Sequence, residues 1–333
     1  MDANFEIRLG IVGTGFIVDK ILSAAKEESR IKVVALYSRT QEQADSFAAK
    51  HQIPYTFTSL EKMASSSLID AVYIASPNSF HASQSILCMQ YGKHVLCEKP
   101  LASNVSEARR MIAISEKYNV TLMEAMMPTM TPHFAQMMER LKDLGTIRRY
   151  FASYCQYSSR YDSLKKGLVL NAFKPELSNG AVMDIGIYTL YPLVVLFGKP
   201  TMIEAQGLKL STGVDGQGSV NFTYKDMNAT VIYSKISDSI LPSEIQGENA
   251  TMVIDRINYI NRVEIKVRGK ESEVISNIAP HNNYFYELKE FVDLITLGRR
   301  ESTINSHTNS LITLEIIDEI RRQLGVVYPA DLL

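Results

Sequence analysis

Two short motifs carry the side chains best suited to proton transfer. The first, Cys97-Glu98-Lys99-Pro100, follows an apolar run, an unusual place for a lysine because lysines mostly lie on solvated surfaces. The second, Asp184-Ile185-Gly186-Ile187-Tyr188, begins an apolar helical segment, so Asp184 and Tyr188 should share one helix face. We interpret Lys99, Asp184 and Tyr188 as a candidate acid–base set for a carbinol or carbonyl group. The alternative for Asp184 is a helix cap.

A glycine-rich turn lies near the N-terminus. The segment Gly13-Thr14-Gly15-Phe16-Ile17 joins an apolar run to a helical pattern. Such a turn lets backbone N–H groups approach a pyrophosphate, and the helix dipole favours its negative charge. Val18 replaces the third glycine of the G-x-G-x-x-G pattern, which affects helix packing more than phosphate contact. Although an ordinary tight turn is the alternative, the βαβ context predicts dinucleotide binding by residues 13–17.

The residues that end the second apolar run bear on the choice of cofactor. An NAD site usually has an acidic residue there, which binds the ribose hydroxyls. This chain has Ser38-Arg39-Thr40 instead, and a hydroxyl followed by a guanidinium suits a 2′-phosphate. The sequence therefore predicts NADP bound through Ser38 and Arg39. NAD is the alternative if Arg39 only points into solvent.

These motifs need elements to position them, and the first half of the chain indicates a parallel sheet. Apolar runs alternate with helical patterns, and the expected strands cover residues 7–13, 32–38, 55–58, 70–76, 94–99 and 120–125. Strands of this kind, separated by helices, are typical of a sheet covered on both faces. We expect an α/β Rossmann dinucleotide-binding domain over residues 1–125. Lys99 would then lie at the carboxyl end of a strand, where such sheets bind ligands.

The second half of the chain has a different pattern. Expected helices cover 132–144, 180–197, 283–297 and 307–323, and expected strands cover 148–158, 202–210, 218–224, 228–236, 250–256 and 262–268. Turn residues between several of these strands are typical of antiparallel neighbours. We therefore predict, over residues 126–333, an α+β domain with a large, mostly antiparallel sheet for substrate binding and oligomerisation.

Composition narrows the class of partner. The 35 basic and 36 acidic residues give a formal charge of -1, which argues against nucleic acid. Uninterrupted apolar runs stay well short of 18 residues and the N-terminus reads as a strand, so neither a membrane span nor a signal peptide is expected. Three scattered cysteines indicate reduced thiols in a cytoplasmic protein, and the histidines lack metal-ligand spacing, so no metal is expected.

Taken together, the motifs resemble the Gfo/Idh/MocA oxidoreductase family. The resemblance rests, in chain order, on residues 13–17, Ala75-Ser76-Pro77-Asn78 with His81, 92–100 and 184–188. It implies that Lys99 and Tyr188 flank the reacting C–O group, with Asp184 nearby. It also implies a further set of cofactor contacts, namely Ser76, Pro77, Asn78, His81 and Glu98. A purely structural role is the alternative for His81.

The resemblance also has limits on the substrate side. Thr129 stands where many relatives have arginine, and Ser178-Asn179-Gly180 replaces a fuller glycine run, so the substrate is not carried over. Tyrosine at position 188 resembles the glucose-fructose oxidoreductase and dihydrodiol dehydrogenase branches. We expect an NADP-dependent oxidoreductase acting on a small polar sugar, cyclic polyol or dihydrodiol. A non-catalytic NAD(P)-sensing regulator is the alternative, which the retained acid–base set disfavours.

The broad sheet of the second half also suggests an assembly. A sheet with helices on one side leaves its other face needing cover, and self-association is the simplest solution. Val220, Phe222 and Tyr224 alternate along one expected strand and are candidates for that face. We therefore expect a homodimer or a dimer of dimers.

Overall fold

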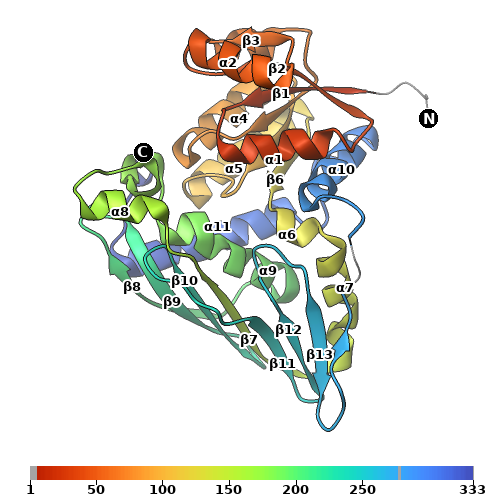
Figure 1. The fold of residues 1–333 in the computed structure, drawn as a ribbon, viewed down its shortest axis with the longest axis vertical. Helices are drawn as coiled ribbons and strands as arrows, with labels where there is room; N and C mark the ends of the chain where they lie inside the picture. The colour runs from red at the N-terminus through yellow and green to blue at the C-terminus, as the bar shows by residue number, and fades with distance from the viewer. Residues whose placement is uncertain (1–5, 277–278, 333) are drawn as a thin grey trace. The chain divides into compact units, whose positions relative to one another are not determined.

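A computed structural model describes residues 6–276 and 279–332 of the chain. Contacts divide the chain into two compact units, the first comprising 1–127 with 281–310 and the second 128–280 with 311–333 (Figure 1). The division near residue 127 lies close to the one predicted, but 281–310 was expected in the second domain. This segment groups with the first unit because α10 (Asn283–Thr296) packs on α1 (Phe16–Ala25), where Arg30 and Asp293 also form an ion pair.

The first unit contains a six-stranded parallel sheet in the order β3-β2-β1-β4-β5-β6. The strands are β1 (Ile7–Val12), β2 (Ile31–Tyr37), β3 (Tyr55–Phe57), β4 (Ala71–Ile74), β5 (His94–Glu98) and β6 (Leu122–Ala125). The central strands are almost fully buried, which explains their continuous apolar sequences. The predicted Rossmann sheet is confirmed, and its strand order reverses between β1 and β4, where such sheets bind ligands.

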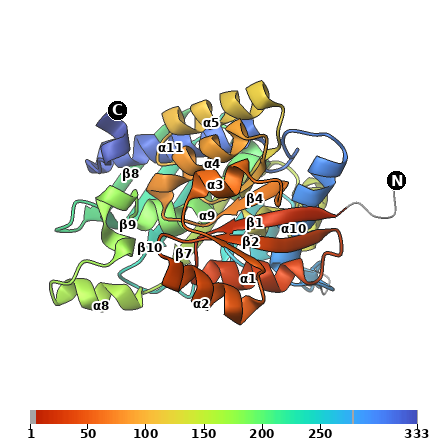
Figure 2. The same ribbon diagram turned by 90° about the horizontal axis from the view of Figure 1, so that it is seen from above.

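Helices cover both faces of this sheet. Figure 2 shows α1 and α2 (Gln41–His51) on one side and α3 (Leu60–Ser65), α4 (His81–Gln90) and α5 (Val105–Tyr118) on the other. Side-chain caps define three of the starts, because Thr40, Ser59 and Asn104 each accept a backbone N–H of the first turn.

The second unit contains an eight-stranded sheet in the order β14-β13-β12-β11-β7-β10-β9-β8. The strands are β7 (Ile147–Cys155), β8 (Met202–Lys209), β9 (Asp215–Thr223), β10 (Asn228–Ser234), β11 (Ser243–Gly247), β12 (Ala250–Ile254), β13 (Val263–Val267) and β14 (Glu273–Val274). Neighbours are antiparallel except β7 and β10, so the mostly antiparallel sheet is confirmed. Strands β11 and β14 were not predicted, because they are short and partly polar.

Helices of the second unit include α7 (Pro132–Arg140), α8 (Ser159–Lys165), the π-helix η5 (Val182–Gly186) and α9 (Ile187–Phe197). Helices α6 (Met127–Met130) and α11 (His307–Leu324) begin in the first unit and continue into the second. Among the described residues, the helical stretch Pro175–Phe197 is long and apolar enough for a membrane span, contrary to expectation. The expectation counted uninterrupted apolar residues, whereas mean hydropathy tolerates Asp184. Because 72% of the apolar window is buried inside the protein, the stretch has the character of a core helix.

The burial pattern of β9 corrects one prediction. Val220 and Phe222 are 0% and 1% exposed, and Tyr224 is half-buried, so this set does not form an open face. The side chains that point outward from β9 are polar, namely Gln217, Ser219, Asn221 and Thr223. The apolar set faces the core because successive side chains of a strand point to opposite faces, and the apolar set is the one that gains from burial.

Candidate active site

The glycine-rich turn joins β1 to α1 at the carboxyl edge of the first unit's sheet. Gly13 has φ +116°, and a Cβ there would lie 2.7 Å from the Ala75 carbonyl oxygen, so only glycine fits. A Cβ on Gly15, the N-cap of α1, would meet nothing within 4 Å, which leaves that backbone open to a ligand. Val18 is fully buried, so valine at the third glycine position packs the helix on the sheet. Phe16 is 72% exposed beside this turn.

A hydrogen-bonded corner links this turn to the end of β2. The Ser38 hydroxyl donates to Gln43 Oε1 at 2.9 Å, and Gln43 Nε2 donates to Thr14 Oγ1 at 2.9 Å. Gln43 belongs to the first turn of α2, and Arg39 beside it is exposed. The corner therefore presents hydroxyls, an amide and a guanidinium next to a helix N-terminus, which are groups that bind phosphate. Sequence reasoning missed Gln43, whose signal was its place three residues after the Thr40 cap.

The segment after β4 is tied to the Lys99 segment by His81. One ring nitrogen of His81 lies 2.8 Å from the Pro100 carbonyl oxygen and the other 2.9 Å from that of Ser76. Burial lowers the pKa of His81, and a neutral imidazole donates to one of these two oxygens. Ser76, Pro77 and Asn78 begin the turn that leads into α4. The Ser76 hydroxyl is buried without a hydrogen-bond partner in the described part of the chain, as a ligand-binding group would be.

Carboxyl groups surround the Lys99 segment. Glu98 ends β5 and accepts a hydrogen bond from the Tyr73 hydroxyl and another from the Lys99 N–H. Glu124, which lies opposite Cys97 on β6, accepts the Leu101 N–H at 2.9 Å. Burial raises the pKa of Glu124 to about 7. Lys99 thus leaves the sheet at its carboxyl edge, as predicted, within a largely acidic setting.

Asp184 lies within the π-helical turn η5, directly before α9. Lys235, which follows β10, donates from Nζ to Asp184 Oδ2. The Lys235 side chain is 4% exposed and its ammonium also lies 5.4 Å from the centre of the Phe173 ring. π-Helical turns within helices are frequent at functional sites. A buried lysine therefore holds the Asp184 side chain in place, and sequence reasoning did not single out Lys235.

Tyr188 lies one turn further along, on α9. Its ring packs edge-on against Tyr154 of β7, with ring centres 5.6 Å apart and an interplanar angle of 81°. The side chain is half-buried. Asp184 and Tyr188 thus lie in consecutive turns of the second unit, whereas Lys99 belongs to the first.

A fully buried carboxylate, that of Asp215, fixes the start of this helix. Asp215 is 0% exposed and accepts the N–H groups of Ala181 and Val182 at 3.1 and 2.8 Å. Gly180 has φ +151°, and a Cβ there would lie 2.3 Å from Asp215 Oδ1, so glycine lets the carboxylate reach the helix. Burial raises the pKa of Asp215 to about 6. The segment Ser178-Asn179-Gly180 replaces the fuller glycine run of many relatives. Its one glycine, Gly180, therefore supports the helix that carries Asp184.

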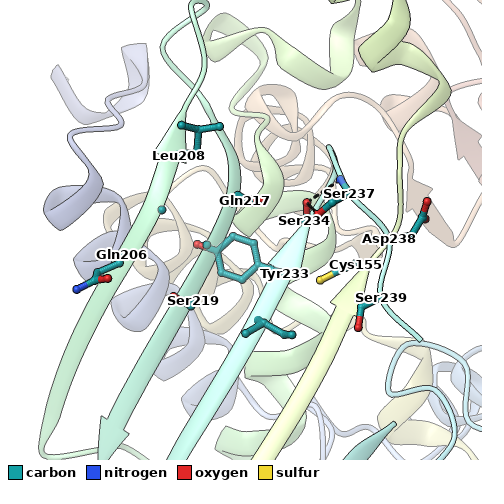
Figure 3. Close-up of a pocket in the computed structure, with 13 residues that line it drawn as sticks. Cys155, Gln206, Leu208, Gln217, Ser219, Tyr233, Ser234, Ser237, Asp238 and Ser239 are labelled. Atoms are coloured by element: carbon teal, nitrogen blue, oxygen red, sulfur yellow. Dashed lines mark hydrogen bonds between the residues drawn. The ribbon is translucent and has the colours of Figure 1, made fainter. Parts of the chain in front are cut away.

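Two other features of the described residues lie apart from these groups. A cavity of about 660 Å³ opens over β8, β9 and β10 of the second unit (Figure 3), and its lining includes none of the predicted site residues. Residues 6–276 and 279–332 hold no cluster of three or more histidine, cysteine or acidic side chains able to bind a metal.

Comparison with known proteins identifies the family of the chain. Residues 7–126 match the family model GFO_IDH_MocA, described as an oxidoreductase family with an NAD-binding Rossmann fold. Residues 134–253 match the GFO/IDH/MocA C-terminal domain. In fold, the chain is similar to an aldose-aldose oxidoreductase from Caulobacter crescentus, with a TM-score of 0.86 at 21% identity over 96% of this chain and 98% of that one.

Two relatives are similar over nearly their whole length. The scyllo-inositol 2-dehydrogenase (NADP(+)) IolU of Bacillus subtilis (strain 168) is 50% identical over 325 residues, which cover 98% of this chain and 99% of that protein. A trans-1,2-dihydrobenzene-1,2-diol dehydrogenase of Xenopus laevis is 31% identical over 96% of this chain and 98% of its own. The chain therefore belongs to the GFO/IDH/MocA oxidoreductase family.

Proposed function

We propose that the chain is an NADP-dependent dehydrogenase that interconverts a CH–OH group and a C=O group on a cyclic polyol of the inositol class. The observation that carries the proposal is the 50% identity to an NADP-dependent scyllo-inositol dehydrogenase across almost the full length of both chains. Sugars and dihydrodiols are the neighbouring substrate classes, since a dihydrodiol dehydrogenase is also a relative. The non-catalytic regulator finds no support among these relatives.

The first unit supports the cofactor part of the proposal. The open backbone at Gly15 and the unpartnered Ser76 hydroxyl fit a dinucleotide at the carboxyl edge of the sheet. The proposed contacts are Gly13, Thr14, Gly15, Phe16, Ile17, Ser76, Pro77, Asn78, His81, Glu98 and Lys99. Ser38, Arg39 and Gln43 would bind the 2′-phosphate, because this corner combines hydrogen-bond donors with a positive charge. When bound, NADP⁺ accepts the hydride of the oxidation.

The proton part of the reaction would fall to Lys99, Tyr188 and Asp184. Tyrosine and lysine ionise near pH 10 and about 10.4 in water, so either needs a stabilising partner to accept a proton at neutral pH. A cationic Lys99 would stabilise a developing alkoxide. Asp184, held by Lys235, would keep a fixed negative charge one helical turn from Tyr188 and orient the polar substrate.

A substrate panel tests the function. Purified enzyme with NADP⁺ should reduce the cofactor with scyllo-inositol or a stereoisomeric inositol, followed by absorbance of the reduced nicotinamide. Open-chain sugars, aldoses and dihydrodiols form the comparison set, and NAD⁺ is tested in parallel. Turnover restricted to dihydrodiols would contradict the cyclic-polyol assignment. Cofactor binding without turnover on any member of the panel would favour the regulator.

We also propose a homodimer or a dimer of dimers in the cytoplasm. The outward face of the eight-stranded sheet supports the assembly, because it carries the exposed side chains of Met202 and Leu208, and Leu208 also lines the polar cavity of Figure 3. The three cysteines form no disulfide, in keeping with a reducing compartment. Light scattering at micromolar concentration tests the assembly, and an outward Asn221→Arg change on β9 should shift it toward monomer. A monomeric wild-type mass would contradict it.

A further inference from the structure

Two buried carboxyl groups of the first unit interact electrostatically, and one of them directly precedes Lys99 in the chain. Glu287, on α10, is 0% exposed, and Glu98 is 8% exposed. The negative charge of Glu98 disfavours ionisation of Glu287. Both side-chain oxygens of Glu287 are buried without a hydrogen-bond partner in the described part of the chain. An ionised carboxylate with no donor and a negative neighbour is strongly disfavoured in such a place.

The two groups differ in what their oxygens contact. Glu98 accepts the Tyr73 hydroxyl on one oxygen and the Lys99 N–H, at 3.2 Å, on the other. Donors of this kind stabilise the ionised form of a carboxyl group. Glu98 has these donors, and Glu287 has none among the described residues. A proton shared by the two carboxyl groups should therefore reside on Glu287.

We propose that Glu287 carries a proton at neutral pH and acts, through Glu98, as a positioning residue for the Lys99 segment. A neutral Glu287 lets the Glu98 carboxylate keep both of its donors. Loss of the proton would bring two negative charges together, and their repulsion would displace Glu98 and the lysine that follows it. The expected effect on turnover rests on the proposed function. The protonation of Glu287 does not depend on that function.

Other titratable groups lie near the pair and enter the design of the test. Burial raises the pKa of Tyr73 well above its usual range, so Tyr73 remains a neutral donor. Tyr284, on the first turn of α10, also raises the pKa of Tyr73 through its electrostatic interaction. Glu124, whose pKa is raised to about 7, interacts with both Glu98 and Lys99 and is the competing source of a buried proton. Burial and the charge of Glu98 raise the pKa of Glu287 well above its usual range.

Infrared difference spectroscopy of the full-length protein tests the location of the proton. At about pH 8.5, Glu124 is mostly ionised, and wild type should still show the C=O stretch of one protonated carboxyl group. Glu287→Gln should remove this band. Glu290→Gln is the matched control, since Glu290 lies on the same helix and accepts the Ser302 hydroxyl at 2.7 Å. A band that survives Glu287→Gln, or that disappears in Glu124→Gln, would overturn the proposal.

Stability against pH gives a second, independent measurement. A carboxyl whose pKa is raised by folding stabilises the protein below its unfolded pKa and loses that contribution as the pH rises toward its folded pKa. The unfolding equilibrium of wild type should therefore shift toward the unfolded state by up to tenfold per pH unit relative to Glu287→Gln. Curves that run parallel would count against a proton on Glu287. If Glu287→Gln does not fold, Glu98→Gln should move the titration of the carboxyl band to lower pH, and an unmoved band would refute the pairing.

The positioning role has its own readout. Glutamine is neutral at every pH, so Glu287→Gln should match wild-type turnover at neutral pH and retain it at alkaline pH, where wild type declines. Glu287→Ala should lose turnover across the whole range, so rescue by glutamine separates the proton from simple packing. Equal pH profiles for wild type and Glu287→Gln would remove the positioning role. If no substrate is found, the proposed function fails while the infrared and stability measurements still decide the proton.

Discussion

Asp215 offers a prediction whose size follows from the structure. Its carboxylate is fully buried and accepts two N–H groups at the start of the helix that carries Asp184. Burial raises its pKa from 3.8 to about 6, and the nearby Lys235 opposes that shift. A difference of about 2 pKa units between folded and unfolded states corresponds to about 3 kcal/mol.

The direction of the effect follows from the raised pKa. The protonated form stabilises the folded protein below about pH 4, and this contribution is lost as the pH rises through about 6. Asparagine does not titrate, so the free energy of unfolding of Asp215→Asn relative to wild type should rise by up to about 3 kcal/mol between about pH 4 and pH 7. The amide can accept one of the two N–H groups at most, which adds a pH-independent loss of about 1–3 kcal/mol.

Urea unfolding followed by circular dichroism, repeated across this pH range, measures the difference. Asp226→Asn is the control, because Asp226 is exposed in the turn between β9 and β10. Its curve should stay parallel to that of wild type. A parallel curve for Asp215→Asn would refute the argument that Asp215 is ionised at the expense of stability. A slope of the opposite sign would show that its N–H donors outweigh burial.

Three further predictions concern cofactor binding, turnover and the stability of the Asp184 site. Arg39→Ala should weaken NADP binding by about 1.5–3 kcal/mol and NAD binding much less, as titration of both cofactors will measure; equal losses would exclude a phosphate contact. Lys99→Met and Tyr188→Phe should each lower turnover about 10²–10⁴-fold, with a strongly non-additive double variant, and near-normal turnover of Lys99→Met would refute the acid–base assignment. Lys235→Met should remove the buried ammonium that contacts Asp184 and destabilise the protein by about 1–3 kcal/mol, less than for a fully buried pair because Asp184 is 35% exposed; unchanged urea unfolding would contradict this.

The first unit was predictable from sequence because its strands are buried on both faces. Such strands read as continuous apolar runs, and the expected ranges overlap all six observed strands. The carboxyl ends of those strands then place residues 13–17, 38–39, 76–78 and 98–99 at one edge, which follows from parallel topology alone. Segment 281–310 escaped prediction because its membership of this unit depends on packing between α10 and α1, which no local pattern encodes.

The second unit was predictable in class but less so in detail. The sequence pattern identified the strands whose apolar and polar residues alternate. Strand β11 (Ser243–Gly247) was missed because Ile245 is its single apolar side chain, which gives no recognisable alternation. The alternation along β9 was recognised, but sequence alone did not say which face met the core. Val220 and Phe222 were therefore assigned to the wrong side.

The supporting residues of Asp184 show why a motif is an incomplete description of a site. Lys235 lies 51 residues after Asp184, and its N–H donates to the Gly216 carbonyl oxygen, which extends the pairing of β9 with β10. The same pairing brings Lys235 beside Asp215, so one strand register supplies both the cation for Asp184 and the carboxylate that caps its helix. Neither partner lies in a recognisable motif, because their positions depend on register and not on local sequence. A one-residue slip between β9 and β10 would turn the alternating side chains to the opposite face and remove both contacts while leaving the Asp184–Tyr188 motif intact.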